Sequence, residues 1–340
     1  MPAPRTLSAL TLTVLLLGLV TTGDRAPSAT LPLPTPEGKG WTAALLTRDE
    51  TGTRFVRSGP AVRRADHFRA GSITKTFVAT VVLQLAAEHR LTLSDTVEEH
   101  LPGVVRGQGN DGRAVTLRAL LQHTSGLYDY TKATRGVVPV SAATAVRLAV
   151  SRPPGRRGTF SYSNTGYVLL GMVIERVTGE PYATAVRRRV LDPLGLTGTS
   201  LPGARRTLPE PHGRAWTADG RDVTTLDPRV AGASGELVTT LDDLDRFYAA
   251  LLGGRLLPAT WLARMLDTGG TRGAYGLGVY PLRLSCGVRV WGHDGRIAGS
   301  YVRSVAVRGG GRVATYRVDT DRAPSAARER AMFDRVFCGR

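Results

Sequence analysis

The chain has 340 residues and 42% of them are hydrophobic, so it can bury one large core or two smaller ones. Its formal net charge is +17, from 45 basic and 28 acidic residues. Such a charge can attract anionic polymers, but we interpret it mainly as a solvated surface. No basic run is interleaved with aromatic residues and no nucleic-acid motif is present, so we expect no nucleic-acid partner.

An apolar run near the N-terminus resembles a secretory signal peptide. Arg5 precedes an apolar stretch at 10–20, which small and polar residues follow at 21–29. The stretch is too short to span a bilayer, which needs about 20 residues. We therefore expect residues 1–29 to be a signal peptide and the mature protein to be secreted. The cleavage position within this segment stays open.

After the signal peptide, strand patterns lie near both ends of the chain and helical patterns lie in the middle. The expected strands are 41–47, 53–58, 275–284, 287–292, 300–307 and 312–318; the expected helices are one opening at Ser72, then 116–123, 142–150, 165–177, 181–191, 241–252, 258–266 and 324–337. The pattern predicts an α+β fold: a mainly antiparallel sheet flanked by helices, plus an inserted all-helical domain. We assign 41–95 and 225–340 to the sheet domain and 96–224 to the helical domain.

The most informative stretch is Ser72-x-x-Lys75, at the start of an apolar run free of Gly and Pro. Residues three apart share a helix face, so the two side chains would meet. Burial lowers the pKa of a lysine, and a neutral Lys75 could take the proton from Ser72 and make it a nucleophile. The alternative is a helix cap with a solvated lysine. Only three of the 45 basic residues are lysines, so the choice of lysine at position 75 favours a task that arginine cannot perform.

Two further polar motifs are weak by themselves. Tyr162-x-Asn164 precedes a helix and is read either as a capping turn or as a phenol and an amide presented at a cleft. His293-Asp294-Gly295 follows a strand and is read either as a hairpin turn or as a polar edge strand beside a substrate. We interpret His123 as a structural residue at a helix end.

Several other chemistries find no support in the sequence. The glycine pattern at 107–112 matches a dinucleotide fingerprint in spelling only, because no strand precedes it. No serine stands in a G-x-S-x-G elbow, the six histidines are scattered, and no P-loop is present. We therefore expect neither a metal site nor a cofactor.

The chain has two cysteines, Cys286 and Cys338. An even count in an exported chain favours a disulfide, which would tie the C-terminus to an interior strand. Two buried free thiols remain the alternative.

Taken together, Ser72-x-x-Lys75, Tyr162-x-Asn164 and His293-x-Gly295 resemble the motifs of the serine-type D-Ala-D-Ala carboxypeptidase and class C β-lactamase superfamily. The likeness extends over most of the chain after residue 41, including 68–76, 120–130, 162–166, 275–278 and the cysteine pair. It is closest to secreted DD-carboxypeptidases with an H-x-G third motif. The resemblance implies an antiparallel sheet flanked by helices, with a helical domain.

The resemblance also implies roles for the site residues. Ser72 would be the acylated nucleophile, and Lys75 and Tyr162 would share the acid–base work, with the identity of the base left open. Asn164 would hold the substrate amide and Lys75, and His293 would supply polarity beside Tyr162. The backbone N–H groups of Ser72 and Arg296 would form the oxyanion hole.

One departure from the family pattern concerns Asp294, which stands where relatives usually have a threonine that contacts the substrate carboxylate. Asp294 would repel that carboxylate unless a cation offsets it, and we expect it to pair with Arg296 or Arg283.

The function that the resemblance favours is a secreted D-alanyl-D-alanine carboxypeptidase that acts on peptidoglycan-type peptides, with β-lactams as covalent inhibitors and an electrostatic association with anionic cell wall. The alternatives are an esterase, β-lactamase or D-amino-acid amidase, or a penicillin-binding protein that does not turn over.

Overall fold

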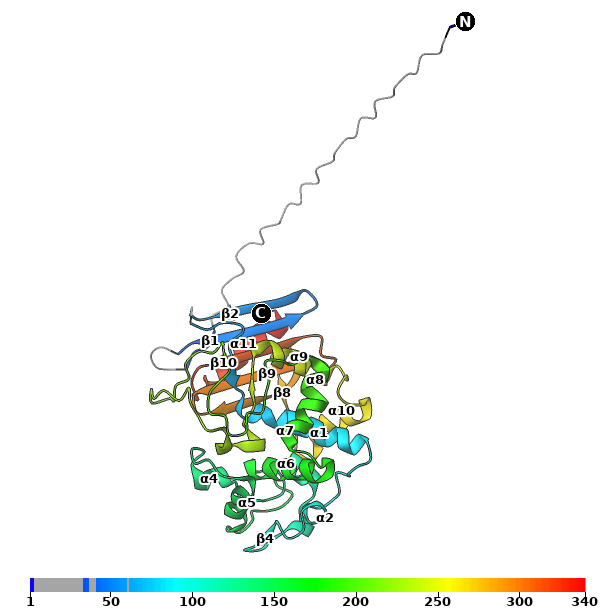
Figure 1. Cartoon of the computed structure of the whole chain (residues 1–340), viewed down its shortest axis with the longest axis vertical. Coiled ribbons are helices and arrows are strands. Elements are labelled where there is room, and N and C mark those ends of the chain that lie inside the picture. The colour runs from blue at the N-terminus through cyan, green and yellow to red at the C-terminus, as the bar shows by residue number, and fades with distance from the viewer. Residues whose placement is uncertain (3–32, 37–40, 60, 340) are drawn as a thin grey trace. The chain divides into compact units, whose positions relative to one another are not determined.

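Strands from the two ends of the chain form one six-stranded antiparallel sheet, in the order β2-β1-β10-β9-β8-β7 (Figure 1). The strands are β1 (Ala43–Asp49), β2 (Gly52–Arg57), β7 (Tyr280–Arg283), β8 (Arg289–Ile297), β9 (Ser300–Val307) and β10 (Val313–Val318). The early hairpin β1–β2 joins the late strands through β1 and β10, where Ala43 lies opposite Val318. The predicted antiparallel sheet is confirmed.

This computed structural model describes residues 1–2, 33–36, 41–59 and 61–339. Apart from its first two residues, the expected signal peptide lies outside the described residues. The described residues from 33 onward form one compact unit. The division of this unit into a sheet domain and a helical domain at the boundaries given above stays a prediction.

Helices α9 (Leu241–Leu252) and α11 (Ala326–Cys338) pack on opposite faces of the sheet. On α9, Asp245 accepts a hydrogen bond of 2.6 Å from Thr315 of β10. On α11, Glu329 binds the side chains of Tyr301 and Arg303, both at 2.6 Å. Successive residues of a strand point to opposite faces, and Ser304, next to Arg303, bonds to Thr315 on the α9 side.

Helix α1 (Thr74–Ala87) runs through the core, with only Gln84 and Ala87 not buried. A helix that is apolar all round is expected to be buried, as found. It is preceded by the 3₁₀ turn η1 (Gly71–Ile73), so the helical segment opens next to Ser72, as predicted. No side chain caps η1, and the capping alternative for Ser72 is therefore wrong.

The remaining helices and turns make up most of the middle of the chain. They are α2 (Val97–His100), η2 (Gly112–Ala114), α3 (Leu117–Leu121), α4 (Tyr130–Thr134), α5 (Ala142–Val150), α6 (Asn164–Thr178), α7 (Tyr182–Val186), the π-helical turn η3 (Arg187–Leu191), α8 (Asp192–Leu194), η4 (Pro228–Val230), η5 (Gly232–Ser234), α10 (Ala259–Met265) and η6 (Gly269–Thr271). Two-stranded ribbons pair β3 (Phe68–Arg69) with β6 (Val238–Thr239), and β4 (Arg106–Gly107) with β5 (Asn110–Asp111). Instead of one loop, the glycine pattern at 107–112 spans the end of β4, the turn to β5 and the first residue of η2.

Two strand boundaries differ from the prediction. The strand expected at 275–284 begins only at Tyr280, because the preceding segment bonds to the end of α10 instead of to a strand: the N–H of Leu277 donates to the carbonyl of Met265 at 2.9 Å. Strand β8 continues past Gly292 to Ile297, so His293, Asp294 and Gly295 lie within a strand. The hairpin-turn interpretation of these three residues is wrong.

Candidate active site

Lys75 is fully buried at the N-terminal end of α1, and its ammonium nitrogen meets three acceptors from three parts of the chain. Nζ donates to Ser72 Oγ at 2.9 Å, to Asn164 Oδ1 at 2.8 Å and to the backbone carbonyl of Ser234 in η5 at 2.7 Å. The structure thus brings together the serine, the lysine and the asparagine that the sequence singled out. Ser234 was not anticipated, since a backbone acceptor leaves no signal in a motif.

The environment of Lys75 makes it a ready proton acceptor. Burial lowers its pKa to about 7, while Asp129 and Asp294 act in the opposite direction. Near neutral pH a large part of the population therefore carries a neutral amine beside the Ser72 hydroxyl. Ser72 itself is only partly buried, so its oxygen is accessible to a substrate.

Asn164 is oriented by a residue to which the sequence analysis gave no role. Its amide Nδ2 donates to Asp129 Oδ2 at 3.1 Å and to Thr131 Oγ1 at 3.2 Å. The amide oxygen must then face Lys75, because a carboxylate only accepts hydrogen bonds. Asp129 thus fixes the direction of the Asn164 side chain, and it lies in the 120–130 segment that carried the family resemblance.

Tyr162 lies on the open side of Lys75. The Lys75 nitrogen lies 4.9 Å from the centre of the Tyr162 ring, and the ring packs against His123 with centroids 4.2 Å apart. Burial raises the pKa of Tyr162 above its usual value, although a hydrogen bond with Ser72 acts against that rise. The residue is 36% exposed, so nearby solvent moderates the effect of burial. At neutral pH the phenol keeps its proton.

His123, which we interpreted as structural, packs against the ring of Tyr162. It is 1% exposed, its Nδ1 accepts the Ser163 N–H at 3.2 Å, and burial lowers its pKa well below the usual value. The ring is therefore neutral, and it contacts Tyr275 at a centroid distance of 4.8 Å. Through this packing, His123 supports the position of the Tyr162 ring.

His293 is buried with both ring nitrogens engaged. Nδ1 faces the backbone carbonyl of Asp294, so this nitrogen carries the proton, and Nε2 accepts from the Tyr275 hydroxyl at 2.7 Å. Burial lowers its pKa, which keeps the ring neutral. The rings of His293 and Tyr162 have centroids 6.5 Å apart. Tyr275 thus holds the His293 ring in place.

Gly295 allows β8 to approach the Ser72 turn closely. A Cβ atom at this position would lie 1.8 Å from the carbonyl oxygen of Ala70 and 3.2 Å from the backbone nitrogen of Ser72. The pairing of β7 with β8 ends at Gly292, so the next part of β8, which includes Arg296, has no strand on that side. The structure therefore brings the Gly295–Arg296 backbone beside the Ser72 turn. The interpretation of these residues as a polar edge strand beside a substrate stays a prediction, since β8 lies between β7 and β9 in the sheet.

Asp294 does not pair with a cation as expected. Its carboxylate accepts a 2.6 Å hydrogen bond from the Tyr280 hydroxyl. Arg296 and Arg283 belong to the described residues, and neither forms an ion pair with Asp294. Burial disfavours its ionisation, but His293, the Tyr280 bond and Arg303 together hold its pKa below the usual value. Arg303 lies opposite Asp294 on β9 and already forms an ion pair with Glu329 at 2.6 Å.

The lack of an ion pair between Asp294 and these two arginines has a simple physical basis. Arg283 and Arg296 are both exposed, and a solvated guanidinium gains little from a surface ion pair. Tyr280, two residues after Gly278, offers a hydroxyl from the neighbouring strand β7 instead. The side chain of Asp294 remains 39% exposed, so its second oxygen is open to a ligand.

Within the described residues, no group of three or more His, Cys, Asp or Glu side chains is arranged to hold a metal ion. Across the same residues, the helices are all too short or too polar to cross a membrane.

The fold and this arrangement agree with comparisons to known proteins. Residues 38–335 match the family model described as Beta-lactamase. The chain belongs to the beta-lactamase family. It is 32% identical over 288 residues to Penicillin-binding protein 4 of Amycolatopsis lactamdurans, covering 78% of this chain and 75% of that protein. The recognition made from the three motifs is thus confirmed.

Among solved structures, this beta-lactamase family member is similar to two proteins named as D-specific hydrolases. A D-stereospecific amidohydrolase from Streptomyces sp. has a TM-score of 0.82 and 41% identity, covering 88% of this chain and 94% of that chain. The D-amino acid amidase of Ochrobactrum anthropi SV3, complexed with D-phenylalanine, has a TM-score of 0.74 and 26% identity, covering 87% and 92%. The α+β fold class is confirmed, and the chain is a β-lactamase-fold hydrolase.

Proposed function

We propose that this protein is a serine hydrolase that forms an acyl-enzyme on Ser72 and acts on amides, esters or peptides of D-amino acids that carry a free amino group. The observation that carries the substrate class is Asp294, a partly exposed carboxylate beside His293 that forms no ion pair with an arginine or lysine among the described residues. The similarity to a D-stereospecific amidohydrolase and a D-amino acid amidase supports the same class.

The proposed reaction begins at Lys75. Its neutral amine takes the proton of the Ser72 hydroxyl, and Ser72 Oγ attacks the substrate carbonyl carbon. We assign the backbone N–H groups of Ser72 and Arg296 to the oxygen that becomes negative, where each such donor contributes about 3 kcal/mol. Tyr162, which keeps its proton at neutral pH, is placed to pass a proton to the leaving nitrogen or oxygen. Water then releases the acyl group by the reverse proton path.

The charges at the site favour an amine over a carboxylate in the substrate. Asp129 and Asp294 both act on Lys75, and Asp129 is already engaged with Asn164. A substrate carboxylate about 4 Å from Asp294 would be repelled by up to about 4 kcal/mol at an effective dielectric of 20, less where water screens the exposed side. An ammonium group at the same place would be attracted by a similar amount.

The DD-carboxypeptidase expected from the sequence remains the second candidate. The similarity to Penicillin-binding protein 4 favours it, and on this reading β-lactams acylate Ser72 and peptidoglycan-type peptides are the substrates. A member that acylates without turnover is a third candidate. We also propose that the protein is exported, a setting in which a disulfide persists and the basic surface meets anionic cell wall.

The first experiment establishes the nucleophile. The protein is incubated with a fluorophosphonate or a labelled penicillin, and the modified peptide is mapped. Label on Ser72 in the wild type and none in Ser72→Ala is expected. Label on a different serine would sink the acyl-enzyme mechanism altogether.

The second experiment decides the substrate class with four matched compounds on a D-Ala-D-Ala core, in which the N-terminus is free or acetylated and the C-terminus is an acid or an amide. The free-amine, C-terminal amide form should have the highest kcat/KM, and acetylation should lower it by about tenfold or more. The Asp294→Asn variant should lose most of this preference, because its side chain is neutral.

The matched control is Asp267→Asn, which removes an exposed carboxylate from a loop after α10 and should leave the preference intact. If the wild type instead prefers the acetylated free acid, and Asp294→Asn does not change that, the amine-directed proposal fails and the carboxypeptidase assignment stands.

A further inference from the structure

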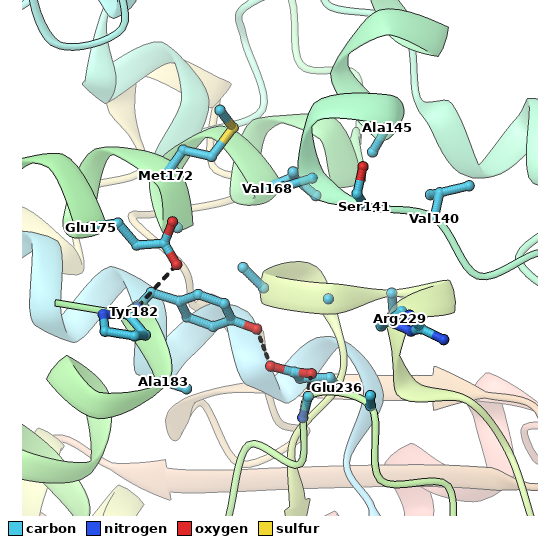
Figure 2. Close-up of a pocket in the computed structure, with 18 of the residues that line it drawn as sticks. Val140, Ser141, Ala145, Val168, Met172, Glu175, Tyr182, Ala183, Arg229 and Glu236 are labelled. Atoms are coloured by element: carbon cyan, nitrogen blue, oxygen red, sulfur yellow. Dashed lines mark hydrogen bonds between the residues drawn. The ribbon is translucent and has the colours of Figure 1, made fainter.

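A cavity of about 380 Å³ opens between α5, α6, α7 and the turn η5, and its lining includes none of the side chains proposed for catalysis (Figure 2). Most of its wall is small and apolar. The residues that define it best are Val140, Ala145, Val168, Met172, Ala183 and Ala233. The volume and the apolar wall are those of a small-molecule site.

One end of this cavity carries two carboxylates that flank the ring of Tyr182 (Figure 2). The Tyr182 hydroxyl donates to one oxygen of Glu236, and the N–H of Gly203 donates to the other at 3.2 Å. The backbone N–H of Tyr182 donates to Glu175 at 3.3 Å. Glu236 is only 3% exposed, whereas Glu175 is open to solvent.

Neither carboxylate has a cation within ion-pair distance among the residues that the structure describes. The one cationic side chain in the described lining, Arg229, is already bound to Asp227 at 2.6 Å. A buried carboxylate without a counter-charge is costly, and burial accordingly raises the pKa of Glu236. Each Glu236 oxygen has accepted one hydrogen bond and can accept another.

We propose that this cavity is a second binding site, which takes a small primary amine with an apolar body. The ammonium group would bind Glu236 and supply the missing counter-charge. The hydrocarbon part would lie against Val168 and Ala145, which are 4% and 2% exposed. The site is independent of the function proposed for Ser72.

The position of the cavity places its occupant next to the catalytic lysine. The wall residue Ala233 adjoins Ser234, the carbonyl of which accepts the hydrogen bond from Lys75. Gly171 of α6 makes this wall tight, since a Cβ there would lie 2.7 Å from the Ala233 side chain. An amine bound here would therefore contact the turn that holds Lys75 without entering the cleft.

The test uses phenethylamine as the probe and 2-phenylethanol as its neutral counterpart, with binding measured by calorimetry on the full protein. The cavity should bind one equivalent of the amine, beyond any amine that Asp294 holds at the catalytic site, and the alcohol should bind there about tenfold or more weakly. Glu236→Gln keeps the shape of the side chain and should weaken amine binding by a similar factor. Ala183→Phe, which fills the cavity from a partly exposed position, should weaken both ligands.

Asp294→Asn is the matched control, because it removes a carboxylate from the cleft instead of the cavity. Retention in this variant of the amine binding that Glu236→Gln weakens supports the proposal. Loss of binding in Asp294→Asn with retention in Glu236→Gln would place the amine in the catalytic cleft and overturn the second site. Absence of measurable binding to the folded wild type would overturn it as well, whatever the activity of Ser72.

Discussion

The proton chemistry at Lys75 can be tested through the pH dependence of acylation. The amine is the proton acceptor only when neutral, and its pKa is about 7, so the acylation rate should rise with pH and level off above that value. Asp294 raises this pKa, and Asp294→Asn should therefore shift the rising limb to lower pH. The measurement is the rate of Ser72 labelling by a neutral probe between pH 5 and 9.

Lys75→Arg provides the control for this profile, since a guanidinium does not lose its proton in this range. Its labelling rate should be negligible at every pH. A wild-type profile that is flat across neutrality, or an active arginine variant, would remove Lys75 from the role of base.

At the scale of single elements, the contact between β8 and the Ser72 turn depends on the missing side chain at Gly295. Gly295→Ala would place a methyl group 1.8 Å from the Ala70 carbonyl oxygen, and the strand must move away. If the Arg296 N–H belongs to the oxyanion hole, kcat should fall by about a hundredfold or more. Gly287→Ala in the loop before β8 has free space and serves as control, although its positive φ costs some stability.

Helix α9 carries a second testable feature, the buried Asp245 beneath the sheet. Burial raises its pKa to about 7, against an ordinary value of 3.8 for an aspartate, while the Thr315 hydrogen bond acts in the opposite direction. The folded protein therefore binds more protons than the unfolded chain between about pH 4 and 7, so this residue makes stability fall as pH rises through that window.

Asp245→Asn removes that titration. The difference in free energy of unfolding, variant minus wild type, should grow by a few kcal/mol as the pH rises from 5 to 8. Denaturant unfolding at several pH values measures the difference. A constant offset between the two proteins would mean that Asp245 does not titrate in this range.

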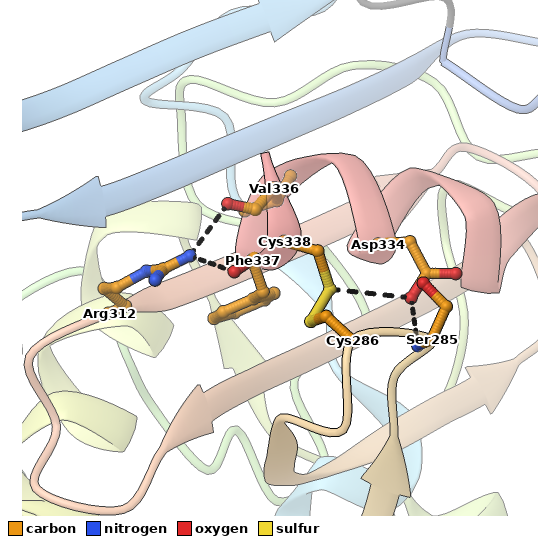
Figure 3. Close-up of a disulfide and its surroundings, with 7 residues drawn as sticks. All are labelled: Ser285, Cys286, Arg312, Asp334, Val336, Phe337 and Cys338. Carbon is orange, nitrogen blue, oxygen red and sulfur yellow. Dashed lines mark hydrogen bonds between the residues drawn. A yellow bond between two sulfur atoms is a disulfide. The ribbon is translucent and has the colours of Figure 1, made fainter. Parts of the chain in front are cut away.

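For the whole molecule, the disulfide is the longest-range covalent constraint. Cys286 in the loop after β7 is bonded to Cys338 at the end of α11, with Cα atoms 5.9 Å apart and a sequence separation of 52 (Figure 3). Arg312 donates to the carbonyls of Val336 and Phe337 at the same helix end. The predicted cysteine pairing is thus present in the structure.

Closing a loop of this length restricts the unfolded chain and contributes about 4 kcal/mol in the chain-entropy model. The double variant Cys286→Ser, Cys338→Ser should lose up to that amount in denaturant unfolding and keep its kcat well below the melting temperature, because no cysteine lies in the proposed site. Wild type treated with a thiol reductant should unfold like the double variant. An unchanged midpoint after complete reduction would contradict the expectation.

Sequence reasoning reached the fold because its signals are local and periodic. Strand alternation and apolar helices such as α1 repeat over many residues, and Thr240 marks the start of α9 by its cap. It reached Ser72, Lys75, Tyr162 and Asn164 because each belongs to a short motif. These signals need no knowledge of which segments meet in space.

The rest of the site depends on contacts between distant segments. Asp129 orients Asn164, Tyr275 holds His293 and Ser234 offers a backbone oxygen, and none of these pairs is close in sequence. The expectation for Asp294 failed for the same reason: cations near in sequence were considered, whereas its partner Tyr280 comes from the adjacent strand.

The three acceptors around Lys75 belong to η1, α6 and η5, segments that meet only when the helical middle of the chain has docked on the sheet side. A partly folded chain that lacks either α6 or η5 leaves the ammonium group without its partners, and it would remain charged and inert. The rate of Ser72 labelling therefore reports when the site is completely assembled. During refolding, labelling should lag behind the recovery of secondary structure and coincide with the last tertiary step.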